Sequence, residues 1–243
     1  MDTSGRIALV TGGAHRVGRA LSTALADAGM RVAIHYNSAA DEANDLVREL
    51  SDRGHECRAY GFDLTHAEAP QSLIDAVTHD FGGLDVLVNS AAVMQRTPLG
   101  SVTTAEWDSM FALNLRAPFF IAQAASPALR AAHGCIVNLA DLAAFETWPA
   151  YIPHGISKAG VVQLTRALAH ALAPDVRVNA IAPGAVLLPN DWDEQAKEHF
   201  ASTTPLRRLG SPEDVVQALL YLIRADYVTG DTLLVDGGRN VRT

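Results

Sequence analysis

The chain has 243 residues, of which 49% are hydrophobic and 19% charged, and this size suits one large α/β domain or two small ones. Nineteen basic against 27 acidic side chains give a formal charge of −8, which argues against nucleic acid or an anionic membrane as the main partner. With two cysteines, no apolar window long enough to cross a membrane and no signal-peptide pattern, the chain is expected to be a cytoplasmic protein.

Short runs rich in β-branched residues alternate with longer amphipathic runs along the chain. We predict strands at 6–10, 31–35, 56–60, 84–88, 135–139, 176–181 and 232–235. We predict helices at 17–28, 41–53, 68–81, 104–131, 154–172 and 212–223. Most strands are too uniformly apolar to have a wet face, which favours a parallel sheet covered by helices on both sides. The order predicts a single doubly wound α/β domain of the Rossmann type over residues 1–243, with seven parallel strands.

A glycine-rich turn directly follows the first predicted strand and leads into a helix. It contains Gly12, Gly13 and Gly18, although the strict G-x-G-x-x-G spacing is absent. Glycines at such a turn let backbone N–H groups and the helix N-terminus face a pyrophosphate. An ordinary turn has the same composition, so the strand–turn–helix context is what favours a dinucleotide site.

The second predicted strand ends His35-Tyr36-Asn37-Ser38, without an acidic residue. An Asp or Glu at this place would hold the ribose 2′-OH of NAD. Its absence, together with Arg16 in the turn, favours NADP(H). Arg16 would supply charge, and Asn37 and Ser38 would donate hydrogen bonds to the 2′-phosphate. The alternative is that Arg16 points into solvent.

Together with later motifs, these residues resemble the short-chain dehydrogenase/reductase family along the whole chain. The matching pieces are the glycine turn, Asp63-Leu64, Asn89-Ser90-Ala91, Asn114, Ser157-Lys158-Ala159, Asn179-Ala180-Ile181-Ala182-Pro183-Gly184, Val228-Thr229-Gly230 and Val235-Asp236-Gly237-Gly238. The resemblance implies a Rossmann fold and an NAD(P)-dependent oxidoreductase. The expected cofactor contacts are Gly12, Ala14, His15, Arg16, Val17, Gly18, Tyr36, Asn37, Ser38, Asp63, Leu64, Asn89, Ala91, Lys158, Pro183, Gly184 and Val186.

Two of these contacts have equally good alternatives. His15 touches phosphate or faces solvent. Asp63 accepts a hydrogen bond from the adenine amino group, as the family implies, or caps a helix. His35 is expected to be structural or to lie beside the adenosine.

Within the family, this sequence resembles the pteridine reductase branch. Arg16 stands in place of the usual second glycine, the segment beginning at His35 is similar, and Asp141 stands where most members carry Ser. Two features depart from that branch. Met94 replaces the aromatic residue that would stack on a pterin ring, and His154 occupies the position of the proton-donating Tyr, four residues before Lys158.

His154 and Lys158 lie four residues apart, so they share a helix face. An imidazolium, with a pKa near 6.5, is a stronger acid than a phenol, with a pKa of about 10. It can therefore protonate a developing anion without a nearby cation to lower its pKa. We expect Asp141 to orient and charge His154, which acts as the general acid. The resemblance implies that Lys158 holds the nicotinamide ribose hydroxyls and that Asn114 orders a water in the proton relay. Lys158 and the helix N-terminus oppose the imidazolium while Asp141 favours it, and the sequence leaves the balance open.

These residues predict an NADPH-dependent oxidoreductase that reduces a carbonyl or C=N bond of a small substrate. One alternative is a pteridine (dihydropteridine) reductase. Another is a protein that binds NADP(H) but has lost its redox activity and serves as a sensor. A dehydratase or epimerase is a further possibility.

The substrate is expected to lie against Met94, Leu142, Tyr151, Leu187 and Trp192, beside Asp141. The polar segment at about 185–205, which carries Trp192 and Phe200, is predicted to form a lid. The remaining histidines lack ligand spacing, so no metal site is expected. Helices 104–131 and 154–172 are apolar on more than one face, which predicts a homo-oligomer, either a dimer or a tetramer.

Overall fold

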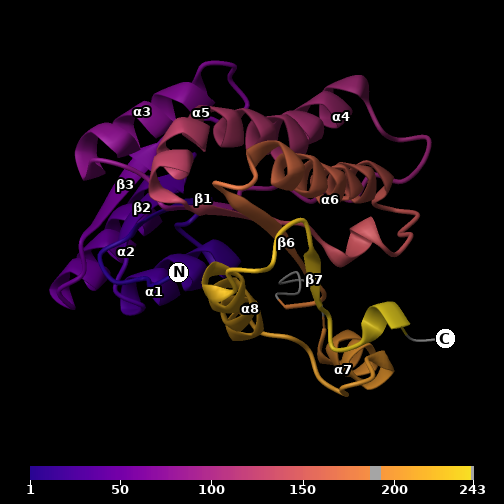
Figure 1. The fold of residues 1–243 in the computed structure, drawn as a ribbon. Coiled ribbons are helices and arrows are strands. Elements are labelled where there is room, and N and C mark those ends of the chain that lie inside the picture. Colours follow the sequence, from indigo (N-terminus) through magenta and orange to yellow (C-terminus); the bar gives the residue numbers. More distant parts are fainter. Residues whose placement is uncertain (187–192, 242–243) are drawn as a thin grey trace.

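The computed structural model describes residues 1–186 and 193–241, and strands rich in buried apolar residues form its centre. They form a single parallel sheet in the order β3-β2-β1-β4-β5-β6-β7 (Figure 1). The strands are β1 (Ile7–Thr11), β2 (Arg31–Tyr36), β3 (Cys57–Gly61), β4 (Val86–Asn89), β5 (Cys135–Leu139), β6 (Arg177–Pro183) and β7 (Thr232–Val235). This confirms the predicted fold class, a Rossmann-like α/β sheet of seven parallel strands.

Helices cover both faces of the sheet (Figure 1). They are α1 (Arg16–Asp27), α2 (Ala40–Asp52), α3 (Ala69–Phe81), α4 (Thr104–Phe111), α5 (Ala117–Ala132), α6 (Ile152–Leu172), α7 (Glu194–Thr203) and α8 (Pro212–Arg224). One hydrophobic core lies between the sheet and α1, α2 and α8, and another lies between the sheet and α3 and α5. The chain order reverses where β1 meets both β2 and β4, and in such sheets ligands bind at the carboxyl ends of the strands near this point.

The helix predicted at 104–131 differs from the observed one in its middle. A π-helical turn, Ala112–Arg116, separates α4 from α5. Such a turn adds a residue to the helix and commonly marks a functional position. Here it contains the buried Asn114, one of the predicted catalytic residues. Hydrophobic periodicity cannot reveal a π-turn, because the apolar residues continue through it.

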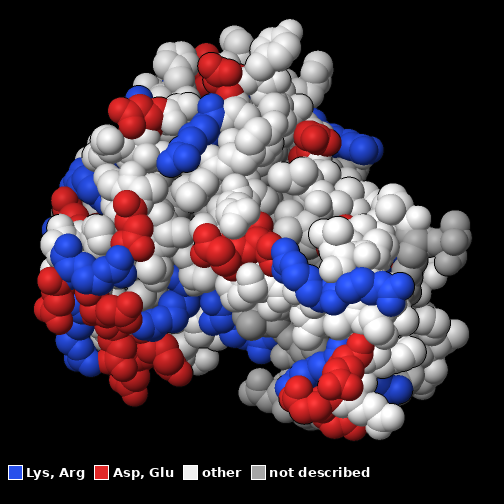
Figure 2. Space-filling model, turned by 90° about the horizontal axis from the view of Figure 1, so that it is seen from below, with Lys and Arg blue, Asp and Glu red and all other residues white. Residues whose placement is uncertain are grey.

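Oppositely charged side chains lie close together on much of the face drawn in Figure 2. The ion pairs of the structure include Arg19 with Glu49, which joins α1 to α2, and Arg48 with Asp45 on α2. Pairing of this kind prevents a large field of one sign from building up over these helices. Among the described residues, no helix is long and apolar enough to cross a bilayer.

Candidate functional site

The glycine-rich turn between β1 and α1 brings bare backbone to the carboxyl edge of the sheet. Gly12 has a φ of +63°, a backbone conformation that residues with a side chain rarely adopt. A Cβ on Gly18 would lie 2.0 Å from the carbonyl oxygen of Gly12, and a Cβ on Gly12 would lie 3.0 Å from Cα of Ala91. Ala14 is buried and Val17 is half-buried beside them. Glycine at these positions therefore lets the turn pack closely against α1 and against the chain after β4, the arrangement in which a helix N-terminus can receive a diphosphate.

His35, near the end of β2, holds this turn by hydrogen bonds to its backbone N–H groups. Its Nδ1 accepts a hydrogen bond from the backbone N–H of Gly12 at 3.1 Å, and its backbone carbonyl accepts one from Gly13 at 2.9 Å. Its Nε2 bonds to the carbonyl oxygen of Phe62 at 2.9 Å. The ring is 2% exposed. This agrees with the structural role expected for His35, but the sequence did not predict its contact with the glycine turn.

The residues predicted to receive the 2′-phosphate lie on the surface beside the turn. Arg16, Asn37 and Ser38 are exposed, and Tyr36 is half-buried with its ring against Gly61. Arg16 has a φ of +53° at the start of α1, in the left-handed region that favours glycine. This conformation costs a non-glycine residue about 1–2 kcal/mol.

The loop after β3 carries the predicted adenine contacts. The Asp63 carboxylate accepts hydrogen bonds from the backbone N–H and hydroxyl of Thr65, which lower its pKa. Its other oxygen lies 3.9 Å from Nε2 of His66. Asp63 therefore caps a short turn rather than a helix. Leu64 is buried beside it, and His15 is an exposed N-cap of α1.

The end of β4 is fixed to both neighbouring strands by side-chain hydrogen bonds. The hydroxyl of Thr11 accepts from the backbone N–H groups of Ser90 and Ala91 at 3.0 and 3.1 Å. The Asn89 amide donates to Oδ1 of Asn138 at 2.9 Å. These bonds fix the start of the chain that leads from β4 toward the predicted catalytic residues.

Asn114 holds the loop after β4 by two bonds to one residue. Its Oδ1 accepts from the N–H of Val93 at 2.9 Å, and its Nδ2 donates to the carbonyl oxygen of Val93 at 2.9 Å and to Oγ of Ser157 at 3.1 Å. The hydroxyl of Ser157 donates to the carbonyl oxygen of His154 at 2.7 Å. The Asn114 side chain thus links α6 to the loop after β4.

His154 lies in the first turn of α6 and is 2% exposed. Its Nδ1 lies 3.3 Å from the carbonyl oxygen of Val93, so Nδ1 carries the hydrogen of that bond. Its Nε2 lies 3.6 Å from Oδ2 of Asp141 and, within the described part of the chain, is a buried atom with no hydrogen-bond partner. Oδ1 of Asp141 accepts from the N–H of Ala143 at 2.8 Å. The structure thus brings Asp141 and His154 together.

Lys158 lies one turn further along α6 and is 5% exposed. Its Nζ donates to the carbonyl oxygen of Leu139, at the end of β5, at 2.7 Å. Burial lowers the pKa of Lys158 from an ordinary 10.5 to about 8, and the nearby Asp141 carboxylate opposes that shift. Lys158 thus lies at the carboxyl edge of the sheet, and its bond to Leu139 uses one of its three ammonium hydrogens.

The predicted substrate wall is only partly described. Leu142 is buried, Tyr151 is half-buried and Met94 is 49% exposed. The Tyr151 ring meets the Trp148 ring edge to face. Leu187 and Trp192 lie outside the described residues, as do residues 188–191 of the segment at 185–205 that is predicted as a lid. Its described helix, α7, is shorter than that segment.

At the nicotinamide end predicted from the sequence, Pro183 is buried at the end of β6, and Gly184 and Val186 are half-buried. A Cβ on Gly184 would lie 3.0 Å from Cα of Asp236, so backbone also approaches backbone here.

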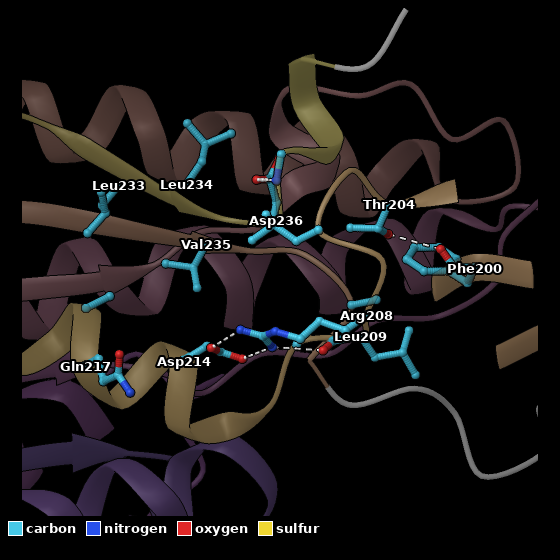
Figure 3. A pocket seen from close by; sticks show the side chains of 16 residues that line it. Phe200, Thr204, Arg208, Leu209, Asp214, Gln217, Leu233, Leu234, Val235 and Asp236 are labelled. Atoms are coloured by element: carbon cyan, nitrogen blue, oxygen red, sulfur yellow. Dashed lines mark hydrogen bonds and ion pairs between the residues drawn. The ribbon is translucent and has the colours of Figure 1, made fainter. Parts of the chain in front are cut away.

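A cavity of about 450 Å³ lies next to this loop (Figure 3). It is lined by residues of α7, α8, β7 and the turns between them, including Phe200, Leu209 and Val235. The Asp214 carboxylate at its edge is bonded to Arg208 through both oxygens, which holds the pKa of Asp214 far below its usual range. The lining does not include Asp141, His154 or Lys158, so this cavity is separate from the catalytic candidates.

Sequence reasoning missed three contributors to the site. They are the His35 ring, the Thr11 hydroxyl and the Val93 carbonyl. The terminal position of His35 in β2 was a usable signal, because β2 lies beside β1 in this fold and the ends of both strands share one edge. The Val93 contact had no signal, since it joins a loop to a distant helix. No group of metal-binding side chains occurs in the described ranges.

Comparison with known proteins identifies the family. Residues 12–240 match the sequence model of the family described as Enoyl-(Acyl carrier protein) reductase. The chain belongs to the short-chain dehydrogenase/reductase family. It is 36% identical to a Streptomyces violaceoruber protein named as a ketoacyl reductase of granaticin polyketide synthesis, over 97% of this chain and 96% of that protein. It is 33% identical to the 3-oxoacyl-(acyl-carrier-protein) reductase FabG of Staphylococcus aureus, over 95% and 96%.

Solved structures of the short-chain dehydrogenase/reductase family have the same fold. The crystal structure of FolM alternative dihydrofolate reductase 1 from Brucella canis, complexed with NADP, matches with a TM-score of 0.94 and 31% identity. The match covers 100% of this chain and 96% of that one. The family assignment expected from the motifs is thus confirmed, and the named relatives are oxidoreductases.

Proposed function

We propose that this protein is an NADPH-dependent reductase of a carbonyl or C=N bond in a small substrate, with His154 as the source of the proton. One observation carries the proposal most directly. A buried imidazole nitrogen of His154, which has no hydrogen-bond partner among the described residues, lies 3.6 Å from a carboxylate oxygen of Asp141, one helical turn before the buried Lys158. A polar atom left unpaired in a protein interior is costly, and such atoms are common at functional sites.

The residues present fit an NADP cofactor. The close approach of Gly18 to Gly12 packs the backbone of the turn against the N-terminus of α1, an arrangement typical of diphosphate-binding turns. Arg16, Asn37 and Ser38 are exposed beside this turn, and residues 37–40, directly after β2, include no acidic side chain that would repel a 2′-phosphate. Relatives support the choice, since a matching structure was solved with NADP. The chemistry that NADPH supplies when bound is hydride donation to an electrophilic carbon.

His154 and Asp141 would then supply the proton that the reduction requires. With Nδ1–H directed to the Val93 carbonyl, a neutral His154 ring would face the Asp141 carboxylate with a lone pair on Nε2. A proton between these two groups removes that repulsion, so the pair is suited to hold one proton. That proton would move to the oxygen or nitrogen that becomes anionic in the reduction. Asp141, whose side chain is 25% exposed, connects the buried ring to open space and to solvent that restores the proton.

Among the more specific substrate classes, we favour a pterin-like substrate. The exposed part of Asp141 can accept a hydrogen bond from a substrate N–H while the pair donates to a neighbouring ring nitrogen. A cyclic C=N compound with an adjacent N–H offers both groups, whereas a simple ketone offers only an acceptor. The match to a structure titled as an alternative dihydrofolate reductase supports this alternative, and the exposed Met94 in place of a stacking aromatic residue weakens it.

Consumption of NADPH, measured by its absorbance, tests the proposal with cyclic ketones, β-ketoacyl thioesters, cyclic imines and dihydropterins. We expect turnover with at least one of these classes. Tight NADPH binding without turnover across the panel would overturn the proposal in favour of a sensor that has lost redox activity.

Arg16 gives a prediction that separates charge from backbone strain. Arg16→Ala and Arg16→Gly should both lower NADPH affinity roughly 10- to 100-fold relative to NADH, as expected for a lost charge-assisted hydrogen bond. Only Arg16→Gly relieves the left-handed conformation, so it should be more stable than Arg16→Ala by about 1 kcal/mol. Calorimetric titration and denaturant unfolding measure the two effects. An unchanged NADPH:NADH ratio would mean that Arg16 does not contact the 2′-phosphate.

We also propose a cytoplasmic homo-oligomer, either a dimer or a tetramer. Both cysteines are free, and large apolar side chains on α5 and α6 remain exposed, with Phe119 at 40%, Phe120 at 42% and Ile156 at 47%. Surfaces of this kind commonly mark interfaces. Sedimentation should give a multiple of the 25.8 kDa chain mass, and Phe119→Asp should lower it, while Leu99→Asp, at an exposed loop position outside both helices, should not. A wild-type mass of one chain at micromolar concentration would contradict this expectation.

A further inference from the structure

The conformation of the glycine turn depends on one buried side chain. Gly12 N–H donates to Nδ1 of His35, and the carbonyl oxygen of Phe62 can only accept, so Nε2 of His35 carries the ring hydrogen. These two bonds fix a single neutral tautomer. Burial supports it by lowering the pKa of His35 to about 4, against the opposing effects of the Phe62 carbonyl and the Asp63 carboxylate.

His35 spans the ends of three neighbouring strands. Its backbone lies in β2, its Nδ1 and its carbonyl oxygen bond to the turn after β1, and its Nε2 bonds to the loop after β3. The N–H groups of Gly12 and Gly13 are therefore already used inside the protein. A diphosphate at this edge would have to be met by the N–H groups further on, at the N-terminus of α1.

We propose that His35 is a positioning residue for the cofactor, because it holds Gly12 and Gly13 in the conformation that opens the N-terminus of α1 to the diphosphate. The inference rests on the proposed function only in that the ligand of the turn is NADP(H). A protonated ring, or a side chain with no acceptor at Nδ1, would place a donor or a gap against Gly12 N–H and release the turn.

Two conservative variants separate the two hydrogen bonds. In His35→Asn the amide oxygen can replace Nδ1 as the acceptor for Gly12, while the bond to Phe62 is lost. In His35→Gln the amide nitrogen can replace Nε2 as the donor to Phe62, while the acceptor for Gly12 is lost. Both variants remove a buried ring, so both should lower the melting temperature.

NADPH affinity, measured by calorimetric titration at pH 7 where both variants are folded, distinguishes positioning from general stability. We expect His35→Asn to bind NADPH within about 3-fold of the wild type and His35→Gln to bind it on the order of 10-fold more weakly. His170→Gln, at an exposed position on α6, is the control. Amide exchange of Gly12 and Gly13 without cofactor should accelerate in His35→Gln and change little in His35→Asn.

Equal affinity of His35→Gln and the wild type would overturn the inference, as would losses in both variants that simply follow the melting temperature. Failure of the wild type to bind NADPH would instead overturn the proposed cofactor. Amide exchange would then still decide whether His35 controls the turn, because that measurement needs no cofactor.

Discussion

His154→Ala should lower kcat by about 10²–10⁴-fold, the range expected when a general acid is removed. NADPH affinity should stay within a few-fold of the wild type, because the known contacts of the ring are with Val93 and Asp141 rather than with the glycine turn. Stopped-flow kinetics at saturating NADPH measure the first effect and calorimetric titration the second. His170→Ala, on the exposed face of the same helix, should change neither.

Further variants test how the proton leaves His154. Nε2 is buried, and the partly exposed Asp141 lies between the ring and open space. If the substrate contacts the imidazole directly, Asp141→Asn should lower kcat less than His154→Ala does. If the proton passes through Asp141, the two variants should lower kcat equally. His154→Tyr, which restores the group usual in this family, should recover part of the rate. Wild-type kcat/KM in His154→Ala would show that His154 is not the proton source.

The architecture could be predicted because each element is determined by local pattern. The runs 84–88 and 135–139 each contain one polar residue, Asp85 and Asn138, and are otherwise apolar. A strand without a continuous polar face must be covered on both sides. The predicted range 31–35 and the observed Arg31–Tyr36 differ by one residue, as do 212–223 and Pro212–Arg224. The π-turn at Ala112–Arg116 was not predictable, because it changes the backbone hydrogen bonds without changing the apolar pattern.

The site could be predicted only where residues share one element or one edge. His154 and Lys158 follow from helical spacing, and the glycine turn follows from its place after a strand. The proximity of Asp141 to His154 came from the family resemblance, since no periodicity relates the end of β5 to α6. The bonds of Asn114 to Val93 and of His35 to Gly12 depend on loop conformations that close only in the folded chain.

Lys158→Met should abolish most activity. Lys158 is the buried cation of the site, held by its bond to Leu139, and the family resemblance assigns its free hydrogens to the nicotinamide ribose. Two charge-assisted bonds of about 2 kcal/mol each correspond to a loss of about 10²–10³-fold in kcat/KM. Wild-type activity should also fall as pH rises through about 8, where the ammonium loses its proton, and this fall should be absent from any residual activity of the variant.

The same substitution should stabilise the fold. Lowering the pKa of Lys158 from 10.5 to about 8 disfavours the charged folded state by about 3 kcal/mol at pH 7. Methionine removes that cost but leaves the Leu139 carbonyl without its donor, which costs about 1–3 kcal/mol. We therefore expect a net gain on the order of 1 kcal/mol in denaturant unfolding, whereas Lys197→Met, at a paired surface lysine, should give none.

The pH dependence of this gain is the more specific test. Between about pH 8 and 10.5 the unfolded wild-type chain binds more protons at Lys158 than the folded protein does, so the wild-type free energy of unfolding rises with pH in that window. The advantage of Lys158→Met should therefore shrink as pH rises from 8 to 10.5. A variant that is less stable at every pH would mean that the buried ammonium contributes more through its bond to Leu139 than its desolvation costs.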